Sequence, residues 1–147
     1  MHVLILYGSL TGNTLLVSEH IQSFLGAKGH TIDLMDQSFC EFEKLSIYDL
    51  AVIGASTWGE GDPNPATQVF IERLDALESI EVKRVALFGL GDSAYEHFCG
   101  VVDKLESTLR HKDVKLLAPS LRLDGFPDEV MFQNIENWLE RDILPQL

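Results

Sequence analysis

Three short apolar runs constrain the fold of this chain more than any other feature. They span residues 3–7, 50–55 and 85–90, and a longer segment with helical signals follows each run. A continuous apolar run of this length is typical of a strand that is covered on both faces, as in a parallel sheet. The alternation of such strands with helices predicts an α/β fold, a doubly wound parallel sheet with right-handed crossovers.

Two further strands and four helices complete the pattern. Residues 30–35 alternate in polarity, and residues 114–117 with 121–123 form a last strand that is interrupted around Pro119. Because proline cannot donate to a strand ladder, we expect this strand at the edge of the sheet or at a bulge. Helices are predicted at residues 13–27, 66–77, 99–111 and 128–143.

Apolar stripes predict which faces of two helices pack on the sheet. The first helix carries Leu16, Val17, His20, Ile21, Phe24 and Leu25, and the last carries Met131, Ile135, Trp138 and Leu139. Gly26 and Gly29 follow the first stripe, where a left-handed residue would end the helix. Pro63 and Pro65 precede the second helix, in line with the preference of proline for helix starts.

The loops that follow the buried strands are the candidate sites, because ligands of such sheets bind beyond the carboxyl ends of the strands. The first, at residues 8–14, carries three hydroxyls, one amide and two glycines at a helix start. Free N–H groups and the helix dipole make such a start suitable for a phosphate. No Lys or Arg precedes Lys28, so this is not a Walker A loop for phosphoryl transfer. A plain helix cap remains the alternative.

The second loop, residues 56–65, places Trp58 beside glycines at the end of a buried strand. We expect its indole to be partly exposed, as a platform for a flat aromatic ligand. The alternative is a tryptophan packed under its own loop. Glu60 and Asp62 add negative charge next to it.

The third loop, residues 90–99, offers a second aromatic platform in Tyr95. Its Gly-Asp-Ser could equally be a simple cap for the next helix. We expect Phe98 in the core and His97 in solvent. No histidine or cysteine pair is spaced for a metal site, and no serine is paired with a histidine and an acid, so we predict neither a metal nor a catalytic residue.

One phosphate cradle and two aromatic platforms at one sheet edge suit a phosphorylated, planar cofactor. A mononucleotide flavin fits better than a dinucleotide, because the first loop lacks GxGxxG.

Composition narrows the partners and the compartment. The formal net charge of −12 argues against nucleic acid and against an anionic membrane surface, and suits a basic protein partner. No apolar run approaches the roughly 20 residues of a membrane span, and we find no signal peptide. Cys40 and Cys99 are predicted to be free thiols in a reducing compartment, so we expect a cytoplasmic protein.

Taken together, these motifs resemble the flavodoxin family. The phosphate signature of that family, Thr or Ser-x-Thr-Gly-x-Thr, is intact at residues 9–14, and Ser56-Thr57-Trp58-Gly59 and residues 91–100 resemble its two flavin loops. The likeness runs from Met1 to about Leu144. The final strand region carries no long insertion and so looks like the short-chain class.

The resemblance implies a single domain, residues 1–147, with a five-stranded parallel sheet of order 2-1-3-4-5 in an α/β/α sandwich, and FMN as the cofactor. The cofactor-binding residues would be Ser9, Leu10, Thr11, Gly12, Asn13, Thr14, Ser56, Thr57, Trp58, Gly59, Glu60, Leu90, Gly91, Asp92, Tyr95, His97, Phe98 and Cys99. Trp58 would stack on the inner face of the flavin and Tyr95 on the outer face.

Within that set, hydroxyls, amide and backbone donors would hold the phosphate: Ser9, Thr11, Asn13, Thr14 and Ser56. The backbone of Gly59 and Glu60 would meet flavin N5, and backbone groups of Asp92, His97 and Cys99 the pyrimidine edge.

By the same resemblance the protein is a monomeric, low-potential one-electron carrier, not an enzyme. Its FMN would cycle between semiquinone and hydroquinone, between a flavodoxin- or ferredoxin-type reductase and acceptor enzymes with basic surfaces. Residues 33–62 hold seven acidic residues against Lys44 alone, either as a docking surface or as a solvated face.

Three alternatives stay open. One is an FMN-dependent reductase of the same fold, although no pocket for an organic substrate is evident. Another is a diflavin-reductase-type FMN module, which residues 59–63 resemble. The third is a phospho-signalling receiver, which needs an acidic pair where this chain has Gly8 and Ser9.

Overall fold

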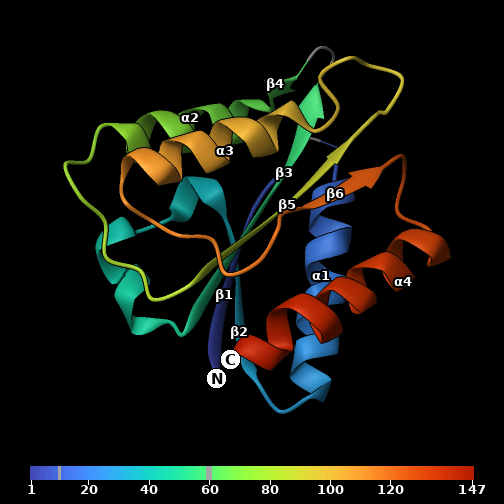
Figure 1. Ribbon diagram of the computed structural model, residues 1–147, viewed down its shortest axis with the longest axis horizontal. Coiled ribbons are helices and arrows are strands. Elements are labelled where there is room, and N and C mark those ends of the chain that lie inside the picture. The colour runs from blue at the N-terminus through green and yellow to red at the C-terminus, as the bar shows by residue number, and fades with distance from the viewer. Residues whose placement is uncertain (10, 59–60) are drawn as a thin grey trace.

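A parallel sheet forms the centre of the molecule (Figure 1). The computed structural model describes residues 1–9, 11–58 and 61–147, and the predictions for Leu10, Gly59 and Glu60 fall outside this part. The parallel strands are β1 (His2–Gly8), β2 (Thr31–Asp36), β3 (Leu50–Trp58), β5 (Val85–Gly91) and β6 (Leu121–Asp124). Their order, β2-β1-β3-β5-β6, confirms the predicted order, with β5 and β6 as the fourth and fifth parallel strands of the described chain.

Helices cover both faces of the sheet. They are α1 (Asn13–Ala27), α2 (Pro65–Asp75), α3 (Gly100–His111) and α4 (Glu129–Trp138). Figure 1 shows α1 with α4 on one face and α2 with α3 on the other, which confirms the three-layer prediction. None of the helices in the described residues is long and apolar enough to cross a membrane.

Short elements that the sequence patterns did not predict complete the chain. Strand β4 (Asp62–Pro63) pairs antiparallel with the end of β3, and 3-10 helices span Gln37–Phe39 and Phe42–Ile47. After α4 the chain continues as a π-helical turn, Leu139–Ile143, and a 3-10 turn, Leu144–Gln146.

Helix α1 ends at Ala27, and Gly29 rather than Gly26 is the left-handed residue that terminates it, as the glycine signals predicted. Gly29 is left-handed, with φ of 92°, and the N–H of His30 returns to the carbonyl of Leu25 at 3.2 Å. The predicted stripe is wrong at Leu16, which is 52% exposed. Successive residues are rotated by about 100° around a helix, so Leu16 lies beside the face formed by the buried Val17 and Ile21.

The stripe of α4 is confirmed in full. Met131, Ile135, Trp138 and Leu139 are all buried. The indole N–H of Trp138 donates to the carbonyl of Pro119 at 3.0 Å, which satisfies a polar group that burial would otherwise leave unpaired. This contact fixes α4 against the segment that leads into β6.

Strand β6 is an edge strand, as Pro119 predicted. The first half of the predicted strand, residues 114–117, contributes only an isolated bridge between Leu116 and Val85 among the described residues. This bridge and the ladder of β6 with β5 are separated by the segment that contains Pro119.

Candidate functional site

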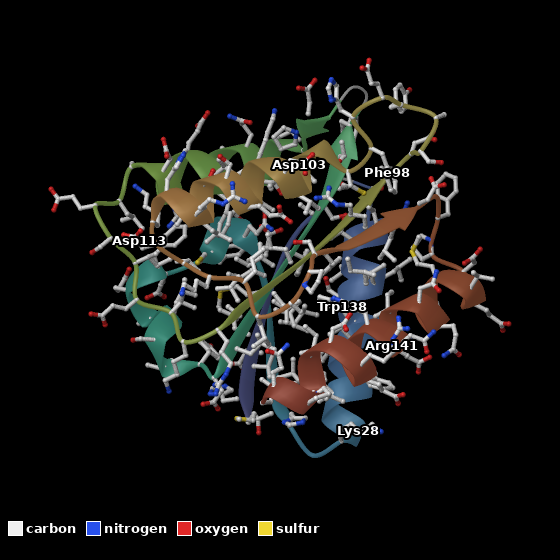
Figure 2. All side chains as sticks on the ribbon, in the orientation of Figure 1. Lys28, Phe98, Asp103, Asp113, Trp138 and Arg141 are labelled. Atoms are coloured by element: carbon white, nitrogen blue, oxygen red, sulfur yellow. The ribbon has the colours of Figure 1, made fainter. Side chains whose placement is uncertain are left out.

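Four loops meet beyond the carboxyl ends of β1, β3, β5 and β6. They enclose a hollow of about 190 Å³ whose lining is Asn13, Ser56, Thr57, Leu90, Gly91, Asp92, Gly125 and Phe126. In Figure 2, Phe98 marks this end of the molecule, and Lys28, at the end of α1, lies at the opposite end. Lys28, the first Lys or Arg of the chain, is therefore far from the loop that precedes α1.

The first loop presents an orphaned hydroxyl at the start of α1. Thr14 is fully buried, and its Oγ1 has no hydrogen-bond partner in the described part of the chain. A buried hydroxyl without a partner costs free energy, so the position needs an acceptor or a donor to complete it. No acidic residue lies in the first turn of α1, so nothing there repels an anion.

Gly12 gives the same loop its shape. It caps α1 in a left-handed conformation, with φ of 91°, and a Cβ built there meets no atom within 4 Å. Its N–H donates to Oγ of Ser9 at 2.9 Å, which leaves the hydroxyl proton of Ser9 available. Thr11 is exposed and Asn13 half-buried beside it. The loop therefore combines backbone donors with several hydroxyls, as a phosphate site requires.

The second loop continues β3. Trp58 is 43% exposed, which confirms the expected partial exposure of its side chain. Hydroxyl Oγ1 of Thr57 accepts from the N–H of Val101 at 3.3 Å and so ties this loop to the start of α3. Gly61 is left-handed and packs on Gly100, where a Cβ would lie 2.8 Å from the Cα of Gly61. The second and third loops are thus held together by close backbone contact.

The third loop carries an exposed Tyr95, 42% accessible, and an exposed His97, as predicted. Phe98 is only half-buried, packed on the core cluster under α3, so its expected core position is confirmed in part. Asp92 organises the turn, because its Oδ1 accepts from the N–H of Ala94 at 2.9 Å. The carboxylate is therefore partly occupied by the loop itself.

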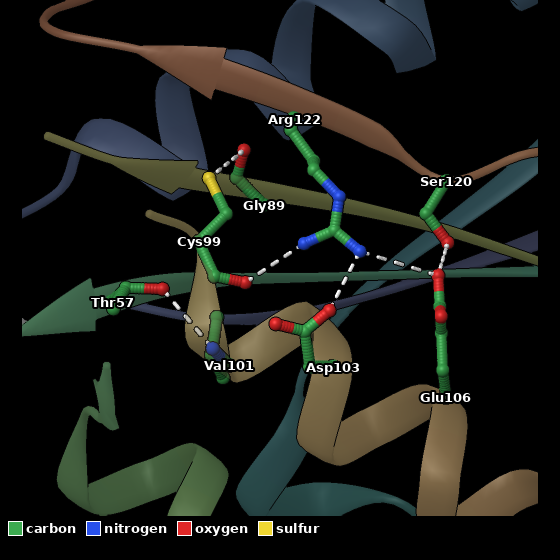
Figure 3. A network of polar contacts seen from close by, with 8 residues as sticks. All are labelled: Thr57, Gly89, Cys99, Val101, Asp103, Glu106, Ser120 and Arg122. Atoms are coloured by element: carbon green, nitrogen blue, oxygen red, sulfur yellow. Dashed lines mark hydrogen bonds and ion pairs between the residues drawn. The ribbon is translucent and has the colours of Figure 1, made fainter. Parts of the chain in front are cut away.

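Cys99 fixes the far end of the third loop. It is left-handed, with φ of 52°, and its thiol lies 3.5 Å from the carbonyl of Gly89. Arg122 donates to the carbonyl of Cys99 at 3.2 Å and to Asp103 at 2.8 Å, and Glu106 lies 3.6 Å away (Figure 3). Burial raises the pKa of the Cys99 thiol to about 11, so the group is a neutral anchor and not a nucleophile.

A fourth loop, after β6, was missed by the sequence analysis. Gly125 is left-handed and donates to the carbonyl of Gly91 at 3.0 Å, and Phe126 is 78% exposed at the wall of the hollow. Ser93 donates to Asp124 through its N–H at 2.9 Å and its hydroxyl at 2.5 Å. The Asp-Gly pair directly after the last strand was the signal that could have indicated this loop.

The acidic stretch 33–62 does not form one surface. Asp33 accepts from Tyr48 at 2.8 Å and lies 3.0 Å from His2, and Asp49 accepts from the N–H of His2. These two carboxylates therefore lie toward the amino ends of the strands. Asp62 lies at the site instead, with an 80% exposed side chain 3.9 Å from Lys104.

A larger hollow, of about 530 Å³, lies between β6 and α4. Arg122, Trp138 and Arg141 line it, and it includes no residue of the first or second loop. The smaller hollow is the better candidate despite its size, because residues of all four loops line it, including Gly91, Gly125 and the exposed Phe126.

Comparison with known proteins agrees with this geometry. Residues 5–138 match the family model described as flavodoxin. A flavodoxin of Nitratidesulfovibrio vulgaris is 38% identical over 143 residues, 95% of each chain, and one of Maridesulfovibrio salexigens is 36% identical over 128 residues, 85% of this chain and 87% of that one. The crystal structure of oxidised flavodoxin 2 from Bacillus cereus superposes with a TM-score of 0.84 at 32% identity, over 94% of each chain.

Proposed function

Since the chain belongs to the flavodoxin family, whose members are FMN-binding electron carriers, we propose that the four loops beyond the strands hold its FMN. The observation that carries the assignment is the buried Thr14 hydroxyl, which has no partner in the described chain and lies at the start of a 15-residue helix. A phosphate oxygen at that point would complete the hydroxyl and face the positive end of the helix dipole.

In this proposal the phosphate is held by neutral groups alone. Ser9, Thr11, Asn13, Thr14 and Ser56 supply hydroxyl, amide and backbone donors. No Lys or Arg precedes Lys28, so affinity depends on many well-directed dipoles and not on one strong charge. The remaining residues of the first loop, Leu10 and Gly12, would contribute backbone groups to the phosphate site.

In the same proposal the second and third loops would hold the flavin ring between their aromatic side chains. Trp58 and Tyr95 are 43% and 42% exposed, so both side chains are accessible to a stacking partner. Backbone groups of Gly59 and Glu60 would serve flavin N5, and those of Asp92, His97 and Cys99 would serve the pyrimidine edge. Thr57, Leu90 and Gly91 line the hollow, and Phe98, which lines the larger hollow next to it, would complete the set of cofactor-binding residues.

When bound, FMN supplies the one-electron chemistry, and the chain tunes it. The aromatic side chains exclude water from the ring. Asp62, Asp92 and Glu96 are exposed around the site and disfavour added negative charge on the cofactor. A low reduction potential follows from this arrangement, and no residue needs to act as an acid, base or nucleophile.

The exposed carboxylates around the site suit partners that are redox proteins with basic surfaces, such as a flavodoxin- or ferredoxin-type reductase and its acceptor enzymes. Their attraction to a chain of formal net charge −12 would speed encounter. We propose that the protein works as a single-domain monomer in the cytoplasm.

The test is to identify the chromophore of the purified protein and then to titrate the apoprotein with FMN. Purified protein is expected to be yellow and to release FMN in acid. Apoprotein with Thr14→Val is expected to bind FMN about tenfold more weakly than wild type, the loss of one good hydrogen bond to a charged acceptor. A colourless protein whose apo form does not quench FMN fluorescence would refute the proposal.

A further inference from the structure

Three buried polar side chains lie behind the phosphate loop, and no function has been assigned to them above. Gln37, Asn64 and Thr67 are 0–1% exposed and come from the 3-10 helix after β2, the cap of α2 and its first turn. Resting on the proposed function, we propose that they are positioning residues, which hold the phosphate loop in its binding conformation without touching the cofactor.

Asn64 joins the start of α2 to the end of β1. Its Oδ1 accepts from the N–H of Thr67 at 3.1 Å, and its Nδ2 donates to the carbonyl of Gly8 at 3.0 Å. The orientation of the amide is fixed chemically, because an N–H can only donate and a carbonyl can only accept. One side chain thus caps a helix and clamps the peptide that precedes Ser9.

Thr67 and Gln37 extend the clamp to β3. Oγ1 of Thr67 accepts from Asn64 at 3.0 Å and donates to Oε1 of Gln37 at 2.7 Å. Nε2 of Gln37 donates to the carbonyl of Gly54 at 2.9 Å. Every polar atom of this chain of contacts therefore has a partner, which is the condition under which a buried network rigidifies its surroundings.

The network packs directly against the phosphate loop. A Cβ at Gly8 would lie 2.1 Å from Oγ1 of Thr67 and 2.4 Å from Oε1 of Gln37, so only glycine fits there. Nδ2 of Asn64 also lies 3.3 Å from Oγ of Ser56, the phosphate ligand proposed on the second loop. The same three side chains therefore set the positions of two phosphate-binding segments.

This positioning matters because the proposed phosphate site has no cation. The attraction between a dipole and an anion depends on direction as well as distance, whereas that of an ammonium depends mainly on distance. Neutral donors must therefore be held in advance within a narrow geometry to bind well. A flavin that lacks the phosphate makes no use of this arrangement.

Thr67→Val provides the test, because it keeps the shape of the side chain and removes the hydroxyl. Apoprotein is titrated with FMN and with riboflavin, and flavin fluorescence quenching gives both dissociation constants. We expect FMN to bind about tenfold more weakly and riboflavin to change by less than about twofold. Thr108→Val is the matched control, because Thr108 is buried in α3 and donates within its own helix, to Lys104 at 2.8 Å.

A second variant keeps the test sharp if Thr67→Val does not fold. Asn64→Ser keeps a side chain that can cap the helix but is too short to reach Gly8. We expect it to weaken FMN binding about tenfold and riboflavin binding by less than about twofold, as for Thr67→Val. If the ratio of the FMN and riboflavin dissociation constants stayed at its wild-type value, the positioning role would be overturned. A wild-type apoprotein that binds neither flavin would instead refute the proposed function.

Discussion

Replacing Arg122 with methionine is expected to loosen the end of the third loop. The guanidinium holds the carbonyl of Cys99, a non-glycine residue in the left-handed region, and reaches Asp103 and Glu106 on α3. Methionine keeps much of the apolar stem and removes every donor. The edge strand β6 then loses its ion pairs with α3, and the weak contact of the Cys99 thiol with the carbonyl of Leu123 remains.

The magnitude follows from the contacts. A hydrogen bond from a charged donor contributes about 1.5–3 kcal/mol, whereas an exposed ion pair contributes about 0–1 kcal/mol. The side chain of Asp103 is 65% exposed, so its 2.8 Å pair belongs to the weaker class. The left-handed backbone at Cys99 costs about 1–2 kcal/mol, which the bond to its carbonyl helps to offset. We expect the free energy of unfolding to fall by about 2–3 kcal/mol.

Urea unfolding of the apoprotein measures this loss, and flavin titration measures its consequence for the site. Because Cys99 is assigned to the ring and not to the phosphate, FMN and riboflavin are expected to weaken together. Arg141→Met is the matched control, since among the described residues Arg141 donates only to the carbonyl of Asn137, one turn earlier in the chain, at 3.4 Å. The reasoning fails if Arg122→Met and Arg141→Met change stability by the same amount.

Three further predictions address other parts of the molecule. The hydroxyl and N–H of Ser93 donate to Asp124 and lower its pKa from the ordinary 3.8, so these bonds stabilise the fold above that pH and lose effect as pH falls through the lowered pKa. Ser93→Ala removes the hydroxyl bond and should destabilise the protein at pH 7, and in urea unfolding the difference from wild type should shrink as pH falls through that pKa; a difference that does not change with pH would contradict this reasoning. Burial and the bond to Asp33 raise the pKa of Tyr48 to about 12; Tyr48→Phe should cost about 1–2 kcal/mol in unfolding and leave FMN affinity unchanged, and altered affinity would contradict the separation of this cluster from the site. Electron transfer to a basic haem protein should slow several-fold as salt rises and depend less on salt after Glu96→Gln, in stopped-flow measurements; a salt-independent wild-type rate would exclude steering.

The three apolar runs determined β1, β3 and β5, and the glycine and proline signals determined where α1 ends and where α2 begins. These features were predictable because they depend on residues that are neighbours in the chain. The position of the site was predictable for a related reason, since loops that follow parallel strands must meet at one edge. The residues that contact FMN remain predictions, including Leu10, Gly59 and Glu60.

Other features depend on segments that only the fold brings together. The exposure of Leu16, the wall formed by Phe126, and the separation of Asp33 and Asp49 from the site were decided by packing between elements. The clearest case is the network of Gln37, Asn64 and Thr67, whose contacts with Gly8 span up to 56 residues of sequence. A phosphate motif can be recognised from its own six residues, but the groups that hold its backbone in place come from distant elements. They belong to tertiary structure because a buried amide must find its partner wherever the chain provides one.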